Sequence, residues 1–230
     1  MGRSLQRRLV PKLELEKVIS SVPPHPSPKV FLEQYTIPPD VAAEMLYIAA
    51  YVYDDIINKK VADLGCGTGR LAIGAAFLGS SESVGIDIDR EAVTIAKKSS
   101  KVLGLDETTS WIVGDLKVLT GGFDTVIQNP PFGVQRRGAD RIFLERALEI
   151  SQKVYSLHKN VSLDRKALKR LRGRGKLIPV NPAPFLERFI EEHGGRIIAV
   201  YAMSMTIPSI FPFHEKLRHS FIVDLYIIEA

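Results

Sequence analysis

The sequence predicts an α/β fold in which helices cover both faces of a mostly parallel sheet. The main observation is that short apolar runs, typical of buried strands, alternate with amphipathic helical segments along most of the chain. A second observation is that a glycine-rich turn, residues 65–69, follows the first of these runs. Several later runs end in acidic or amide side chains. Open α/β sheets bind their ligands at the carboxyl ends of the strands, so we expect a binding site there.

The chain has 230 residues, of which 45% are hydrophobic, and this is enough to bury one large core. We expect residues 1–30 to form an N-terminal extension and residues 31–230 to form a single domain. A proline-rich stretch, residues 22–28, is expected to be an extended connector within the fold rather than a linker between domains.

Hydrophobic periodicity and turn residues place the elements in order. The expected helices cover residues 13–20, 39–57, a segment that begins near residue 70, and then 90–103, 143–152 and 183–193. The expected strands are a first one that ends at residue 63, followed by 83–87, 111–115, 123–128, 153–158, 196–203 and 220–228.

The glycine-rich turn lets the backbone approach a ligand closely, because Gly65, Gly67 and Gly69 carry no side chain. Arg70 stands where a dinucleotide-binding fingerprint has its third glycine, and the sequence contains no G-x-x-x-x-G-K-[ST] phosphate loop. Asp63, just before the turn, can hold an ammonium group or order the loop. A ligand with a positively charged amino-acid end therefore fits better than a pyrophosphate.

Two further aspartates follow expected strands. Asp87 ends the second strand about 20 residues after the turn, the distance at which an acidic side chain binds ribose hydroxyls. Asp115 ends the third strand, where its carboxylate can accept from an adenine amino group. Either aspartate could instead cap a helix, and for Asp89, which directly precedes an expected helix, capping is the better interpretation.

The tetrapeptide Asn129-Pro130-Pro131-Phe132 follows the fourth expected strand and is conformationally rigid, because both prolines have a fixed φ and lack an N–H. It holds an amide side chain, a free carbonyl and an aromatic ring in a fixed relation. A planar amino group could donate one hydrogen to the Asn129 side chain and the other to the Pro130 carbonyl while its π system stacks on Phe132. The amino group could belong to a base or to a side-chain amide. The alternative is an ordinary strand-ending turn.

Together these motifs resemble the class I S-adenosylmethionine-dependent methyltransferases that modify amino groups. Blocks at residues 32–38, 132–133, 138–140, 154–159, 207–208 and 212–214 narrow the resemblance to the methyltransferase-like protein 5 family, which methylates N6 of an adenosine in small-subunit ribosomal RNA. The resemblance implies a Rossmann-like, mostly parallel seven-stranded sheet. It also implies S-adenosyl-L-methionine as cofactor and S-adenosyl-L-homocysteine as product. It assigns Asn129, Pro130, Pro131 and Phe132 to catalysis. The cofactor-binding residues that it implies are Gln34, Tyr35, Thr36, Asp63, Gly65, Cys66, Gly67, Asp87, Ile88, Asp115, Leu116 and Asn129, and by this resemblance Gln34, Tyr35 and Thr36 cover its methionine end.

Charge is consistent with an RNA partner. The formal net charge is +5, and seven basic residues lie between positions 165 and 176. This stripe can bind phosphates, although a solvated surface loop explains it equally well. Arg136, Arg137 and Arg141 follow the catalytic turn closely enough to rim the site. The histidines show no metal-binding spacing, and we expect no metal.

Three alternative functions remain open from the sequence: a DNA adenine-N6 methyltransferase, a protein glutamine-N5 methyltransferase, and a binding module without catalysis. Cys66 is the only cysteine and is expected to fill space, which agrees with a cytoplasmic location. No apolar run is long enough to span a membrane.

The resemblance also suggests a small zinc-binding methyltransferase activator as partner. In the usual strand order the third strand, residues 110–113 with Trp111 and Ile112, lies at the edge of the sheet. We expect this edge either to bind such an activator or to be shielded by self-association.

Overall fold

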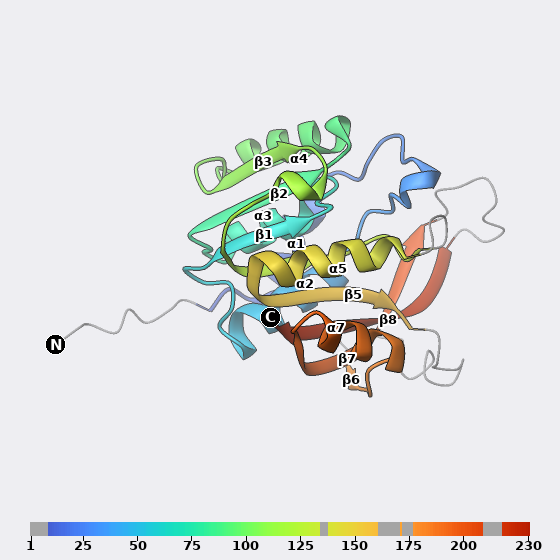
Figure 1. The fold of residues 1–230 in the computed structure, drawn as a ribbon. Coiled ribbons are helices and arrows are strands. Elements are labelled where there is room, and N and C mark those ends of the chain that lie inside the picture. The colour runs from blue at the N-terminus through green and yellow to red at the C-terminus, as the bar shows by residue number, and fades with distance from the viewer. Residues whose placement is uncertain (1–8, 134–137, 161–170, 172–176, 209–217) are drawn as a thin grey trace.

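The computed structural model describes residues 9–133, 138–160, 171, 177–208 and 218–230. Its centre is one eight-stranded sheet with the strand order β3-β2-β1-β4-β5-β8-β7-β6 (Figure 1). The strands are β1 (Lys60–Leu64), β2 (Glu82–Asp87), β3 (Thr109–Val113), β4 (Phe123–Gln128), β5 (Ser151–Lys159), β6 (Ile178–Pro179), β7 (Arg196–Pro208) and β8 (Arg218–Glu229). β1 to β5 pair in parallel, whereas β8 pairs with β5, and β7 with its two neighbours, in antiparallel orientation. The predicted mostly parallel sheet is confirmed.

The register brings the carboxyl ends of the first four strands to one edge of the sheet. Leu64 of β1 lies opposite Ile86 of β2 and Gln128 of β4, and Asp87 lies opposite Val113 of β3. Because each strand stops at nearly the same level, the segments that follow these strands meet in space although they are far apart in the sequence.

Helices cover both faces of the sheet (Figure 1). On one face, α1 (Lys12–Ser21), α2 (Pro39–Tyr47) and α3 (Arg70–Phe77) pack on one another, and α4 (Arg90–Val102) packs on β2 and β3 beside α3. On the other face, α5 (Ala139–Ile150) packs on β4 and β5, and α7 (Pro184–Glu192) packs on β7. The short turns are η1 (Val30–Leu32), η2 (Ile48–Val52) and η3 (Leu116–Val118).

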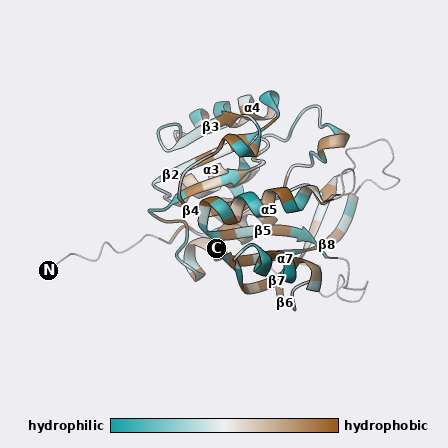
Figure 2. Cartoon of the chain, viewed as in Figure 1, coloured by the Kyte–Doolittle hydropathy of each residue, from teal (hydrophilic) through white to brown (hydrophobic). Residues whose placement is uncertain are grey.

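The two larger hydrophobic cores lie on the two faces of the sheet. The core under α1, α2 and α3 includes the fully buried Leu15, Met45 and Tyr155, and the core under α5 and α7 includes Leu144 and Tyr226. In Figure 2 the surface helices α4 and α5 carry both hydrophobic and hydrophilic residues, as expected for elements with one buried side. Among the residues that the structure describes, no helix is both long enough and apolar enough to cross a membrane.

Several predicted boundaries were wrong. The helix expected over 39–57 ends as α2 at Tyr47 and continues only through the π-helical turn η2, because Asp54 then takes a left-handed backbone conformation (φ 59°). The helix expected from residue 143 begins four residues earlier, after Gly138, whose positive φ of 80° sets up the first turn. The sheet has eight strands instead of seven because the two-residue β6, too short to show an alternating pattern, pairs with β7.

The division into an extension, residues 1–30, and one domain from residue 31 stays a prediction. α1 lies within that extension, yet its Leu15 and Ile19 are fully buried in the first core.

Candidate active site

A cavity of about 480 Å³ opens at the carboxyl ends of β1 to β4. Its walls are the glycine-rich turn, the segments after β2, β3 and β4, the start of α5, and a segment that we call the strap, residues 22–37. Every residue predicted to bind the cofactor lines this cavity: Gln34, Tyr35, Thr36, Asp63, Gly65, Cys66, Gly67, Asp87, Ile88, Asp115, Leu116 and Asn129. The structure therefore brings all of these side chains and glycines together around one space, and their contact with a cofactor stays a prediction.

The glycine-rich turn is fixed by Asp87 from the neighbouring strand. The Gly67 N–H donates to one carboxylate oxygen of Asp87 (2.8 Å), and the Asp89 N–H donates to the other (2.8 Å). Gly67 has a φ of 53° and Gly69 has a φ of 89°, conformations that favour glycine. A side chain at Gly69 would also collide with the Trp111 ring, which lies 2.5 Å from the position of an added Cβ. Each Asp87 oxygen keeps a free lone pair, so Asp87 can order the turn and still accept from ribose hydroxyls.

The carboxyl group of Asp63 is buried, and few neighbouring groups stabilise its charged form. Only 1% of the residue is exposed, and within the described part of the chain its carboxyl group accepts a hydrogen bond from the Ala72 N–H (3.0 Å). Burial raises the pKa of Asp63 to about 8, an effect that the Ala72 N–H only partly offsets and that the charge of Asp87 increases. A cation placed in the cavity next to Asp63 would favour its ionised form.

This pKa predicts that cofactor binding releases a proton. If the ligand's ammonium group lies near Asp63, its charge lowers the pKa of Asp63 below 8, so affinity increases as the pH rises from about 6 toward 8. Calorimetry at pH 7 in buffers of different ionisation enthalpy should detect the release of about one proton, because the pKa of Asp63 lies above pH 7 in the free protein and falls below it on binding. Asp63→Asn should abolish this release. Equal binding enthalpies in all buffers for the unmodified protein would rule out the contact.

The strap is held over the cavity at both ends and in the middle. The Arg70 guanidinium donates to the carbonyls of Val22 (2.9 Å) and Ile37 (2.7 Å), and so joins the two ends of the strap to the start of α3. In the middle, Asp89 binds the strap through Lys29 and Gln34.

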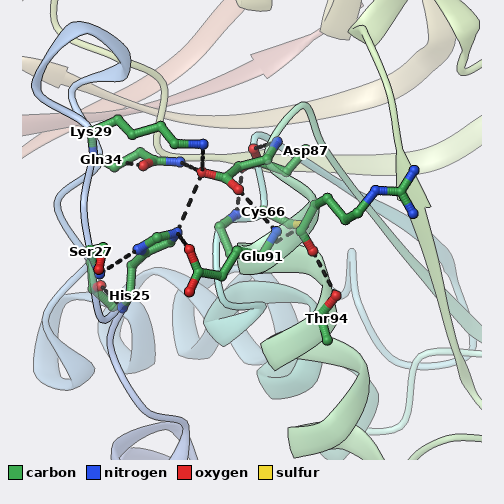
Figure 3. Close-up of polar contacts among 12 residues, drawn as sticks. His25, Ser27, Lys29, Gln34, Cys66, Asp87, Glu91 and Thr94 are labelled. Carbon is green, nitrogen blue, oxygen red and sulfur yellow. Dashed lines mark hydrogen bonds and ion pairs between the residues drawn. The ribbon is translucent and has the colours of Figure 1, made fainter.

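The Lys29 ammonium lies 2.9 Å from the Asp89 carboxylate, the Gln34 amide donates to it (2.8 Å), and His25 Nε2 lies 3.4 Å away. Figure 3 shows these three side chains converging from the strap. Burial alone would raise the pKa of Asp89, but Lys29 and Gln34 lower it below its usual range. The same carboxylate accepts from the Glu91 N–H (3.0 Å), so it also caps α4 as the sequence predicted.

Sequence reasoning missed how the strap is fixed. Gln34 was expected to cover the cofactor, and it lines the cavity, but its amide is also bonded to Asp89 and to the Lys29 N–H. His25, for which the sequence suggested no role, lies buried next to Asp89. The departure of Arg70 from the dinucleotide fingerprint was the only available signal, because a charged residue there must find partners in the fold.

The turn at residues 129–132, whose catalytic role stays a prediction, lies at the other end of the strap. The Tyr35 hydroxyl donates to the Asn129 side-chain oxygen (3.2 Å), and the Tyr35 ring stacks on Phe132 with 5.2 Å between centroids and 28° between planes. Asn129 and Pro131 line the cavity, whereas Pro130 is buried and Phe132 packs between Tyr35 and Phe221. The turn therefore borders the cavity through Asn129 and faces away from it through Phe132.

A buried polar network supports this turn from below. The Gln128 amide, one residue before Asn129, donates to Ser156 Oγ (3.0 Å). Ser156 Oγ lies 2.8 Å from His158 Nε2, and His158 Nδ1 lies 3.7 Å from the Asp140 carboxylate at the start of α5. Burial alone would raise the pKa of Asp140, but His158 outweighs it and lowers the pKa. The network ties the ends of β4 and β5 to α5.

The far end of the cavity suits a flat apolar ring. Ile88 and Leu116 give this part of the cavity wall apolar surface, and the Asp115 carboxylate, also in the wall, accepts from the Lys117 N–H (2.9 Å). Burial raises the pKa of the Cys66 thiol well above its usual value, which keeps it neutral. This agrees with the expected space-filling role.

Some predicted features lie elsewhere. Arg136, Arg137, the seven basic residues between positions 165 and 176 and the block at 212–214 lie outside the described residues. Arg141 lies over the Phe185 ring, 5.2 Å from its centroid. β3 is at the sheet edge as predicted, but Trp111 does not extend from it: the ring packs against Gly69 and Gly85, and its N–H donates to Ser100 (3.1 Å).

The residues present fit S-adenosyl-L-methionine. Asp63 offers a buried carboxyl group for the ammonium, Asp87 and Asp115 can accept from ribose hydroxyls and an adenine amine, and Ile88 offers an apolar surface to the ring. Thr68 Oγ1, in the cavity wall, is buried and has no hydrogen-bond partner among the residues that the structure describes, as expected for a polar atom that a ligand satisfies.

Comparisons with known proteins agree with this geometry. The family model described as "Methyltransferase small domain" matches residues 37–158. An uncharacterized protein of Methanocaldococcus jannaschii is 38% identical over 221 residues, which cover 90% of this chain and 89% of that protein. The rRNA N(6)-adenosine-methyltransferase METTL5 of Danio rerio is 41% identical over 156 residues, which cover 66% of this chain and 75% of that protein. A crystal structure from Pyrococcus horikoshii is 36% identical, with a TM-score of 0.79, and covers 96% of this chain and 98% of that chain.

Proposed function

This chain belongs to the METTL5 family of rRNA N6-adenosine methyltransferases, and we propose that it methylates the N6 amine of an adenosine in small-subunit ribosomal RNA. Its cofactor is S-adenosyl-L-methionine. The observation that carries the proposal is the position of Asn129. Its side chain lines the cofactor cavity and accepts a hydrogen bond from the hydroxyl of Tyr35, whose ring stacks on Phe132. A planar amine held at Asn129 would thus lie at the boundary between the cofactor and an aromatic platform.

The chemistry rests mainly on positioning. When bound, the cofactor supplies a methyl group that is already electrophilic, so the chain needs no strong base to activate the amine. Asn129 and the Pro130 carbonyl would each accept one amine hydrogen, which favours a pyramidal nitrogen and stabilises the positive charge that develops on it. Alignment of this kind contributes up to ~7–11 kcal/mol to catalysis.

The target adenine must leave its stack to reach Asn129. Flipping a base out of a duplex costs a few kcal/mol, and least where the base is already unpaired. Stacking on Phe132 would return ~1–3 kcal/mol of this cost. A flipped, weakly paired adenosine is therefore the substrate that the turn favours, and a ribosomal RNA substrate agrees with the cytoplasmic location expected from the cysteine content.

One assay separates this function from its alternatives. Purified protein and labelled cofactor would be mixed in parallel with small-subunit RNA, large-subunit RNA, genomic DNA and a release factor. We expect label in small-subunit RNA alone, recovered as N6-methyladenosine. Label recovered in DNA, or on a glutamine of the release factor, would instead support one of the two rival enzymes.

We further propose that the outer edge of β3 binds a small zinc-binding activator protein. β3 ends the sheet, and its last residue, Val113, is 40% exposed. An unpaired edge of this kind accepts a further strand, and a charged side chain on it disfavours such pairing.

Light scattering of the chain with the activator from the same organism should give the mass of a one-to-one complex, and the chain alone should self-associate. Val113→Lys should weaken both kinds of association. Val102→Lys, on α4 at a side chain that is 86% exposed, is the matched control and should leave both intact. A monodisperse monomer that ignores the activator contradicts the proposal.

A further inference from the structure

Tyr35 makes the two contacts that the proposed mechanism assigns to the target adenine. Its hydroxyl donates to the Asn129 side-chain oxygen, and its ring stacks on Phe132. The hydrogen bond joins residues that are 94 positions apart in the sequence, so both contacts depend on the placement of the strap over the catalytic turn.

The backbone of the strap directs Tyr35 toward the turn. Glu33 has a left-handed conformation (φ 52°), and the Tyr35 N–H donates to the Glu33 carbonyl (2.8 Å), which forms a tight bend just before the ring. Gln34, between them, is bonded to Asp89. The bend and this bond hold Tyr35 in place while leaving its side chain, which is half-buried, at the end of the cavity.

We propose that Tyr35 is an internal substitute for the target adenine, which it replaces in the free protein and which displaces it when RNA binds. The inference rests on the proposed function, because it takes Asn129 and Phe132 to be the adenine's contacts. It assigns to Tyr35 a role toward the RNA base, in addition to the cofactor-covering role expected from the sequence.

The adenine would make the same two kinds of contact that Tyr35 makes in the free protein. A stacked phenol gives way to a stacked purine, and one O–H donor gives way to an amine with two N–H donors. The half-buried Asn129 side chain thus keeps a partner in the free protein, where an unsatisfied acceptor would cost free energy. Only a base that offers both an aromatic face and a donor amine replaces both contacts, so Tyr35 would also favour adenine over uracil.

Removing the hydroxyl tests this competition. Tyr35→Phe keeps the ring but loses the bond to Asn129, so the closed state becomes less stable and RNA should bind about 2- to 12-fold more tightly, the range for one net hydrogen bond. The probe is small-subunit ribosomal RNA, with the protein saturated in S-adenosyl-L-homocysteine. Tyr51→Phe is the matched control: the Tyr51 hydroxyl accepts from the Val10 N–H (3.0 Å) outside the cavity wall, and its loss should leave RNA affinity unchanged.

Tyr35→Ala distinguishes displacement of Tyr35 by the adenine from insertion of the adenine beside it. If the adenine inserts between Tyr35 and Phe132, then Tyr35 is a second stacking wall, Tyr35→Phe binds like the unmodified protein, and Tyr35→Ala binds more weakly. That pattern, or weaker binding by Tyr35→Phe, overturns the inference.

Nitration of Tyr35 by tetranitromethane, read by peptide mass spectrometry, gives a readout that does not depend on affinity. Small-subunit RNA should accelerate nitration of Tyr35 because the ring is displaced, and poly(U) should not. Methyl transfer to the RNA with Tyr35 still protected would refute the inference alone. No transfer to any adenosine and no change in nitration would refute the proposed function, and the inference with it.

Discussion

Asn129→Ala is expected to lower the turnover number about 100- to 1,000-fold, the effect of losing one preorganised hydrogen-bonding group in a transition state. The side-chain oxygen of Asn129 accepts a hydrogen bond from the Tyr35 hydroxyl, and the reacting amine would bind at this oxygen. The variant therefore loses an acceptor that is used mainly during transfer, and its affinity for S-adenosyl-L-methionine should be almost unchanged. Single-turnover kinetics with labelled cofactor, together with calorimetry for cofactor affinity, measure the two quantities separately.

Asn129→Asp is the matched variant, because it keeps an acceptor oxygen in the same place and should retain part of the activity. Near-normal turnover by Asn129→Ala would show that the amine does not depend on this side chain. A large loss of cofactor affinity without any loss of turnover at saturation would assign Asn129 to cofactor binding alone.

Asp87→Ala is expected to weaken S-adenosyl-L-methionine binding by about 10- to 150-fold, which corresponds to ~1.5–3 kcal/mol for hydrogen bonds to a charged group. The structure gives a second reason for a large effect. The same carboxylate accepts from the N–H groups of Gly67 and Asp89, so its removal also loosens the glycine-rich turn that borders the cavity. Calorimetric titration of the folded variant with the cofactor measures the change.

Asp124→Ala is the control for Asp87→Ala. Its carboxylate also accepts from one backbone N–H, that of Lys60 (2.8 Å), but it lies at the start of β4, away from the cavity. It should bind the cofactor normally. If Asp87→Ala bound the cofactor with unaltered affinity, Asp87 would serve only to order the turn.

The wall of the site could be predicted because its signals are local, whereas the edge position of β3 was predicted from the resemblance to class I methyltransferases. Asp87 ends β2 and Asn129 directly follows β4, while Gly67 and Asp115 follow β1 and β3 after one or two intervening residues. Parallel strands that end at one level bring such residues together without further information. The two-residue β6 gave no periodic signal of its own, and it forms only because β7 offers an edge for it.

The strap could not be predicted in the same way. Its contact between Gln34 and Asp89 spans 55 residues, and Asp89 already had a sufficient local explanation as the cap of α4. The position of the Trp111 ring could not be predicted for a related reason. A large apolar residue on an edge strand suggests an exposed surface, but Gly69 and Gly85 leave space for this ring inside the fold. In both cases tertiary contacts determined where the side chain lies.

The central claim, that this chain methylates N6 of an adenosine in small-subunit ribosomal RNA, is tested most directly by nucleoside mass spectrometry on RNA from cells that lack the protein. Small-subunit RNA should lose N6-methyladenosine at one site, and re-expression of the protein should restore it whereas Asn129→Ala should not. Large-subunit RNA should be unchanged. Full N6-methyladenosine content in the small-subunit RNA of the deleted cells would contradict the claim.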